Sequence, residues 1–258
     1  MHNYFVFVQK ETMELLRTKR LLGLLSVFAF FAFTSPLLAR YITEFIALMV
    51  PAEEAIGFLI PDPVWTDSYA QFYSNISQIG NIVLILLFMG VIAAEKQLNT
   101  IDLMVTKGLG FTNFVFAKFT VLAVTAFFTI KISILINYLY TGILFDTAGQ
   151  ITNVLMGALV FFFYMLLVIA LTLFASAIAK STAFAALLAL AGFLAISAVS
   201  AIPRIGDFLP GNLHARSMEV TTMGYYHQTL LWNIASAIAL AALFLGLSVL
   251  VLKKQEGE

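Results

Sequence analysis

Six long apolar runs dominate this chain, and they restrict what it can fold into. They cover residues 21–39, 79–94, 114–139, 154–179, 184–202 and 230–252. Each is close to the length of about 20 residues that a helix needs to cross the hydrocarbon core of a bilayer. The runs are continuous, whereas the strands of a membrane barrel alternate apolar and polar residues. We therefore predict an all-α membrane protein with six transmembrane helices, formed by residues 1–258 as a single transmembrane domain.

The composition excludes several other classes of protein. Hydrophobic residues make up 61% of the chain and charged residues 11%, against about 45–50% and about 25% in soluble domains. The net charge is +0, so no basic excess is present to bind a nucleic acid. The absence of cysteine excludes disulfides and thiolate metal sites.

The basic residues predict the orientation. If the N-terminus lies inside, ten of the 14 Lys and Arg residues flank the spans on the cytoplasmic side and three lie outside, while Lys131 falls within the third span. This excess follows the positive-inside rule. Both termini are then cytoplasmic, in what we predict to be the plasma membrane of a prokaryote.

Two connecting segments fall on the predicted outer side. Residues 41–60 are fairly apolar but contain carboxylates and Pro51, so we predict an outer-surface helix or loop there rather than a span. Residues 203–229 predict a second loop, in which His214 and His227 are too far apart for a helical zinc pair. The aromatic residues before the second span predict an interfacial belt or a contact with hydrophobic substrate: Trp65, Tyr69, Phe72 and Tyr73.

Residues 1–20 predict an amphipathic interfacial helix. Phe5, Val8, Leu15 and Leu16 fall near one helical face. Such a helix lies along a membrane surface with its basic end near lipid phosphates. It is either an anchor for the first span or a lever that contacts a cytoplasmic partner. Its polar residues of interest are Lys10, Glu14, Arg17, Lys19 and Arg20.

The loop between the second and third spans predicts a short cytoplasmic helix over residues 95–107. Leu98, Ile101, Met104 and Val105 have helical spacing, and Gly108 is able to end the helix. The apolar face is suited either to lipid or to a groove on another protein.

Three sets of residues resemble ATP-binding-cassette (ABC) permeases of the type-2 class. The sets are Lys10-Glu11…Glu14-Leu15-Leu16-Arg17-Thr18-Lys19-Arg20 with Ser35-Pro36; Pro61-Asp62-Pro63 with Asp67-Ser68-Tyr69-Ala70-Gln71-Phe72; and Glu95-Lys96…Thr100-Ile101-Asp102-Leu103…Thr106-Lys107…Phe114…Lys118-Phe119. The chain departs from that pattern at Asn99, where the class often has Gly, and at Gly108, where it often has Pro.

The resemblance implies a permease subunit of an exporter. Two permease subunits, identical or related, would pair, and each would bind a cytoplasmic ABC ATPase subunit. The coupling residues would be Glu95, Thr100, Asp102, Leu103, Thr106 and Lys107. The chain has no phosphate-binding G-x-x-x-x-G-K-[S/T] loop, so we expect it not to be an enzyme. It would hold no cofactor itself, with ATP and Mg on the partner subunit.

Lys131 and Asn137 are candidates for a polar substrate path. A charge deep in a span costs about 2.5–3.5 kcal/mol on insertion scales. The alternative is that Lys131 snorkels to the interface or pairs with a carboxylate such as Asp146.

Two other functions stay open on the sequence. An ion-gradient-driven transporter would be expected to carry paired carboxylates within its spans, and the six runs contain none. A non-transport membrane protein is the other alternative, although no nucleophile or HExxH motif supports an intramembrane enzyme.

Overall fold

A computed structural model describes residues 2–49, 62–98, 100–101 and 110–256, which form helices joined by turns and contain no strand. Six helical segments are long and apolar enough to cross a membrane: Arg20–Phe45, Trp65–Gln97, Phe111–Phe145, Ile151–Ile178, Thr182–Ser200 and Leu230–Gln255. The all-α prediction is confirmed, and the chain is a multi-pass membrane protein.

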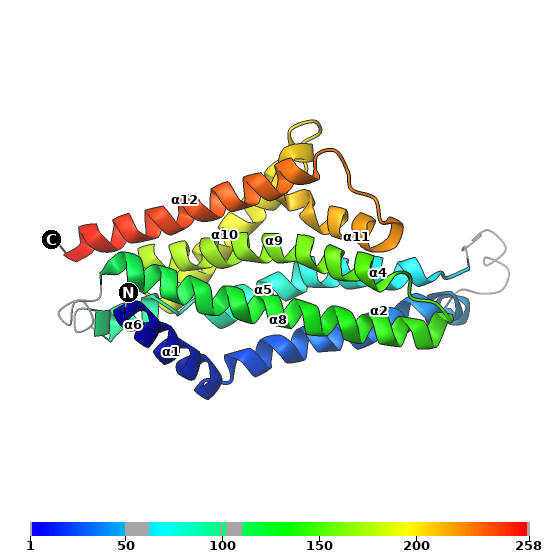
Figure 1. Ribbon diagram of the computed structural model, residues 1–258, viewed down its shortest axis with the longest axis horizontal. Coiled ribbons are helices and arrows are strands. Elements are labelled where there is room, and N and C mark those ends of the chain that lie inside the picture. Colours follow the sequence, from blue (N-terminus) through cyan, green and yellow to red (C-terminus); the bar gives the residue numbers. More distant parts are fainter. Residues whose placement is uncertain (1, 50–61, 99, 102–109, 257–258) are drawn as a thin grey trace.

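The helices form an elongated bundle around α9 (Ile151–Ile178), the most buried of the six segments (Figure 1). It packs against α8 (Phe111–Phe145), α10 (Thr182–Ser200) and α12 (Leu230–Glu256). The N-terminus, α6 and the end of α12 lie at one end of the bundle, which we call the terminal end. The other end, which we call the opposite end, carries α4 and α11.

The first span is longer than predicted. Helix α2 runs from Arg20 to Met49, so residues 41–49 of the predicted outer-surface helix or loop are helical and continuous with the first span. The apolar part of this helix extends to Phe45, six residues beyond the predicted run. Residues 50–61 lie outside the described part of the chain.

The second span begins 14 residues before the predicted run and is made of several pieces. Helix α4 (Trp65–Asn75) passes through a π-helical turn, η1 (Ile76–Gly80), into α5 (Asn81–Phe88). After a break comes α6 (Ala93–Gln97). Tyr69 and Phe72 have no exposed surface, so α4 presents these rings to the protein core, and the predicted interfacial belt was wrong for them.

The predicted loop at residues 203–229 is largely structured. Two 3₁₀ turns, η2 (Gly206–Phe208) and η3 (Pro210–Asn212), lead into α11 (Leu213–Met223). Helix α11 packs back onto α9 and α4 through one face, whose residues are spaced three to four positions apart. The prediction of a loop overlooked this spacing. The buried residues of that face include Leu213, Ser217, Val220 and Thr221.

Glycine permits this close packing of α11. A Cβ atom on Gly157 of α9 would collide with the Thr221 hydroxyl and lie 2.6 Å from the Ser217 carbonyl oxygen. Small residues allow helix backbones to approach closely in membrane proteins. The position of α11 therefore depends on a residue more than 50 positions away in the sequence.

Helix α1 (His2–Arg17) packs against α8. Of the predicted apolar face, Leu15 is buried and Val8 is partly buried against the core, whereas Phe5 and Leu16 are exposed. Phe7 and Glu11 are buried as well, and Glu11 is drawn inward by a buried lysine on α8.

Candidate functional site

Five charged side chains from three elements meet at the terminal end. Helix α1 contributes Lys10, Glu11 and Glu14, α6 contributes Glu95, and α8 contributes Lys118. We call this group the ion cluster. It joins the N-terminal helix to the end of the second span and to the start of the third.

Lys118 is the interior charge of the ion cluster. Its side chain is 1% exposed, and its Nζ lies 2.9 Å from Oε2 of Glu11 and 2.9 Å from Oε2 of Glu95. The rings of Phe114 and Phe7 flank the ammonium, with centroids 4.9 and 5.6 Å away. A buried charge is tolerated only when its partners replace its hydration, and here two carboxylates and two aromatic faces do so.

Lys10 bonds all three carboxylates of the ion cluster. Its Nζ lies 2.8 Å from Glu11, 2.9 Å from Glu14 and 2.8 Å from Glu95. The three carboxylates lie close enough together to ligate a metal ion. The Lys10 ammonium, however, already pairs with each of them, so the cluster carries its own counter-charge.

The environment shifts the ionisation of the two outer members. Burial by itself lowers the pKa of Lys10, but hydrogen bonds and charge attraction from Glu11 and Glu95 outweigh burial and raise it above its ordinary value. Burial by itself raises the pKa of Glu14, while the hydrogen bond and positive charge of Lys10 outweigh it and lower the pKa. Both shifts favour the charged forms.

The end of the second span is also fastened to α9. The Ser176 hydroxyl accepts the backbone N–H groups of Ile92 and Ala93 at 3.0 and 2.9 Å and donates to the Met89 carbonyl at 2.7 Å. Lys96 donates to the carbonyls of Ala177 and Ala179 at 2.8 and 3.1 Å, where α9 leaves its last carbonyls without helical partners. These bonds replace the helical bonds lost at the break between α5 and α6.

The structure brings together residues from both predicted sets, the interfacial helix and the coupling segment. Lys10, Glu14 and Glu95 meet in the ion cluster, and the Thr100 hydroxyl donates to the Glu95 carbonyl at 3.0 Å. Arg20 lines a small cavity of about 20 Å³ beside Glu14 and Lys118. The other predicted coupling residues, Asp102, Leu103, Thr106 and Lys107, lie outside the described residues.

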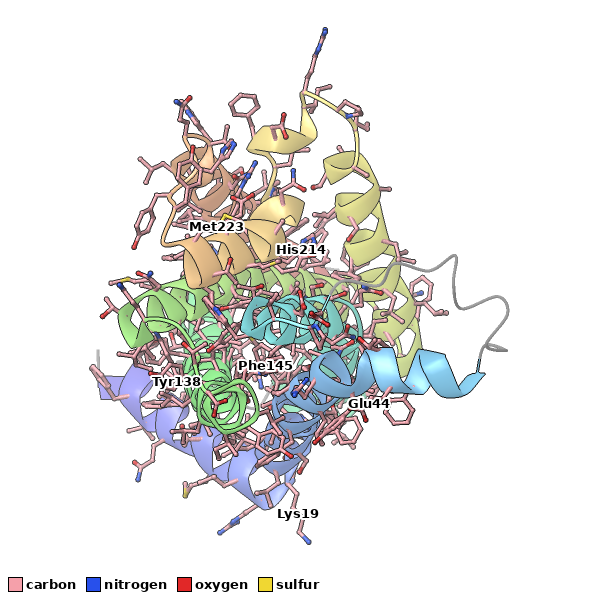
Figure 2. All side chains as sticks on the ribbon, turned by 90° about the vertical axis from the view of Figure 1, so that its right-hand side faces the viewer. Lys19, Glu44, Tyr138, Phe145, His214 and Met223 are labelled. Carbon is pink, nitrogen blue, oxygen red and sulfur yellow. The ribbon has the colours of Figure 1, made fainter. Side chains whose placement is uncertain are left out.

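Arg17 and Lys19 stay apart from the ion cluster. Both side chains are exposed, and Lys19 has a left-handed backbone with φ of 57°. Lys19 thereby forms the corner at which α1 turns into α2. Figure 2 labels it at the lower margin of the molecule.

Lys131 and Asn137 lie on α8 but do not form one site. Lys131 donates to the Leu155 carbonyl of α9 at 2.6 Å and lies 5.9 Å from the centre of the Phe127 ring. Its ammonium thus bonds a backbone carbonyl and not the Asp146 carboxylate, and snorkelling to the interface stays a prediction. Its role in a substrate path stays a prediction.

Asn137 has no exposed surface, and its amide bonds a backbone carbonyl of α2 that lacks a helical partner. Pro36 lies inside α2 and has no N–H to donate to the carbonyl of Ala32. The Asn137 amide nitrogen donates to that carbonyl at 3.3 Å. The hydroxyls of Ser68 and Thr141 lie 3.4 and 3.5 Å from the Asn137 Oδ1 atom, so three helices meet at this amide.

Sequence reasoning did not assign Glu11, Lys118, Lys96 or Ser176 to a site. A signal was present for two of them. Lys118 interrupts the apolar stretch at the start of the third span, and Glu11 lies four residues from both Phe7 and Leu15, which is the spacing of one helical face. An acid on an apolar face of α1 and a lysine in an apolar run indicate a buried pair.

The sequence matches no protein-family model and no curated protein sequence. The candidate function is therefore argued from the geometry of the ion cluster and from the resemblance of three sets of residues to type-2 ABC permeases.

Proposed function

We propose that this chain is the membrane permease subunit of an ATP-driven exporter. It would pair with a second permease subunit, and a separate cytoplasmic ATPase subunit would bind near the terminal end. The observation that carries the proposal is the ion cluster, because it ties the segment after the second span to both α1 and α8.

A force applied to α6 is transmitted to the neighbouring helices through the side-chain bonds between them. A partner that holds the segment beyond Glu95 would move α6. Glu95 bonds Lys10 of α1 and Lys118 of α8 directly, and Lys96 bonds the end of α9. Movement of α6 would thus either carry three other helices with it or break these bonds.

ATP binding favours one arrangement only if the partner binds the two arrangements with different affinities. Breaking a buried ion pair by removing one partner costs about 3–5 kcal/mol. The state in which the bonds of the ion cluster are made and the state in which they are broken therefore differ enough in free energy to be two distinct states. This makes the ion cluster a suitable coupling element for an ATP-driven cycle.

The test is reconstitution of the chain with the ATPase encoded by a neighbouring reading frame. We expect the complex to hydrolyse ATP faster than the ATPase alone. Glu95→Gln keeps the shape of the side chain but removes its charge, and it should abolish most of that stimulation. Glu219→Gln is the matched control, because Glu219 also forms an ion pair, with Arg216 at 2.9 Å, but on α11.

Two results would contradict the proposal. One is stimulation by Glu95→Gln equal to that of the unchanged chain, with both proteins equally well inserted. The other is active export from vesicles that contain this chain alone and are energised by an ion gradient, which would favour the gradient-driven alternative.

A further inference from the structure

A cavity of about 420 Å³ lies between the second span, α9, α10 and α11. Six elements line it: the π-helical turn η1, α5, α9, α10, the 3₁₀ turn η3 and α11. π-helical turns within helices are frequent at functional sites. The lining residues are Ser77, Gln78, Ile82, Tyr164, Phe193, Leu194, Ser197, Ser200, Ala201, Gly211, Asn212 and His214.

Close packing builds the floor of this cavity. Gly211 donates its N–H to the Ser200 hydroxyl at 3.2 Å, and a Cβ atom at Gly211 would collide with that same side chain. Ser200 and Ser77 are more than nine-tenths buried. Figure 2 labels His214 at the start of α11. The polar groups are therefore held in place by the fold.

The lining combines polar and apolar side chains, and among the described residues that form it there is no carboxylate, lysine or arginine. Within a membrane protein, an ion placed there would lose its hydration and find no opposite charge. Phe193, Leu194 and Ile82 supply apolar surface on the other walls. The chemistry favours an uncharged molecule that has one apolar side.

Several polar side chains of the lining have a free acceptor. The hydroxyls of Ser77 and Ser197 donate to the carbonyls of Ser74 and Phe193 at 3.0 Å each, which leaves their oxygens free to accept. Asn212 uses its amide nitrogen on the Gly206 carbonyl at 2.8 Å, which leaves Oδ1.

His214 adds a further acceptor. Its Nδ1 lies 2.7 Å from the Gly211 carbonyl oxygen. Because a carbonyl only accepts, Nδ1 carries the hydrogen, and Nε2 of the neutral ring is left as an acceptor.

We infer that this cavity binds an uncharged, hydroxyl-rich molecule with one apolar face, such as a glycoside of an aromatic alcohol. The ligand would donate hydroxyl hydrogens to Ser77, Ser197, Asn212 and His214 and pack its apolar side against Phe193. If the chain is the permease proposed above, this ligand would be of the class that it exports, and that identification rests on the proposed function. The binding of the ligand to the cavity does not rest on it.

The test measures binding to the intact chain in lipid nanodiscs, without any ATPase, by saturation-transfer NMR. The probe is phenyl β-D-glucoside. Two analogues keep its skeleton: phenyl β-D-glucuronide carries a negative charge, and phenyl tetra-O-methyl-β-D-glucoside has no hydroxyl donors. We expect the glucoside to bind, and each analogue to bind roughly tenfold more weakly or worse.

Two variants of α10 link this binding to the cavity. Ser197→Phe fills the cavity and should raise the Kd of the glucoside by roughly tenfold or more. Ala195→Phe adds the same ring to the same helix outside the lining and should leave the Kd unchanged. Circular dichroism and thermal unfolding of both variants confirm that each is folded.

The inference is overturned if the glucoside does not bind, if the charged or methylated analogue binds equally well, or if folded Ser197→Phe binds the glucoside as the unchanged chain does. None of these results bears on ATP coupling at the terminal end. Conversely, loss of coupling in the ATPase experiment leaves this binding measurement intact.

Discussion

The two ends of the bundle are held together by different chemistry. At the terminal end, Lys118 and Lys10 bond three carboxylates. At the opposite end, neutral groups make the bonds: the Tyr69 hydroxyl donates to the Ala148 carbonyl at 2.8 Å, and the Tyr73 hydroxyl lies 3.0 Å from that of Thr221. Charged groups take a smaller part at the opposite end of the described chain: Arg216 pairs with Glu219 within α11, the Asp67 carboxylate accepts the Val64 N–H at the start of α4, and Arg40 lies over the Phe145 ring. The other contacts are made by hydroxyls, amides and close packing.

This difference teaches what each end is suited to do. Charge pairs attract over longer distances than neutral hydrogen bonds and respond to pH, to salt and to the charge of a partner. Neutral hydrogen bonds depend on contact geometry and do not titrate near neutral pH. We therefore expect the terminal end to respond to its surroundings and the opposite end to keep a fixed shape, and the following predictions test that contrast.

The largest effect is expected from Lys118→Met. It leaves Glu11 and Glu95 buried with only Lys10 to balance them, and removal of one partner from a buried pair costs about 3–5 kcal/mol. Thermal unfolding in detergent should show a large fall in stability. Lys131→Met is the control, since that lysine loses one hydrogen bond to a carbonyl, which is worth about 1 kcal/mol. Equal losses in the two variants would contradict the assignment of Lys118 as the structural charge of the terminal end.

The next effect is at the opposite end, from Gly157→Ala. The new methyl group would collide with the Thr221 hydroxyl and push α11 away from α9, at a cost of about 1–3 kcal/mol. Hydrogen exchange should show loss of protection in α11 while α1 keeps its protection. Gly246→Ala on α12 meets open space and should leave α11 unchanged. If both variants behave alike, close packing at Gly157 does not hold α11.

A smaller effect is expected where α2, α4 and α8 meet. Asn137→Ala leaves the Ala32 carbonyl without a partner, which costs about 1–3 kcal/mol. Pro36→Ala restores the N–H that this carbonyl would normally receive, so Asn137→Ala should cost less in a Pro36→Ala background. A double-mutant cycle measured by unfolding gives the coupling directly. Strictly additive effects would show that the two residues act independently.

The smallest effect is a dependence on pH confined to the terminal end. The pKa of Glu14 is lowered in the folded state, so its contribution is present above its ordinary pKa of about 4.3 and is lost as the pH falls through the lowered value. The pKa of Lys10 is raised, so its contribution is complete below about 10.4 and is lost only as the pH rises through the raised value.

Hydrogen exchange at a series of pH values checks this dependence. Protection of α1 should fall in acid before protection of α11 does, and Glu14→Gln should reduce the part of the acid response that Glu14 contributes. A parallel loss of protection in both helices, or an unchanged response in Glu14→Gln, would break the contrast between the two ends.

The positions of the spans were predicted well from the sequence, with one exception. The six apolar runs predicted all six spans because a stretch of about 20 apolar residues has few alternatives to a membrane helix. The runs located the third to sixth spans within six residues at each end. They missed α4, which contains few aliphatic residues. Its serine and tyrosine side chains find their partners on α8, on α11 and in the turn before α9, and the sequence pattern does not show those partners.

The candidate site was predicted only in part. Glu95 was predicted to couple to an ATPase subunit, and Lys10 and Glu14 to lie on an interfacial helix that is either an anchor or a lever. In the structure Lys10 bonds both carboxylates within this chain. Periodicity reports which residues share a face of one helix and carries no information on which face of a neighbour they will meet. For that reason Glu11 and Lys118, which are 107 positions apart, could not be paired in advance.

The sequence by itself determined that this chain is a bundle of six membrane-crossing helices, because the hydrophobic effect and backbone hydrogen bonding act on each segment separately. Only the tertiary structure decided that α11 folds back onto Gly157, that Asn137 serves the carbonyl left free by Pro36, and that three carboxylates converge on two lysines. The physical reason is that buried polar groups need partners, and those partners come from segments that only the packing of the bundle brings together.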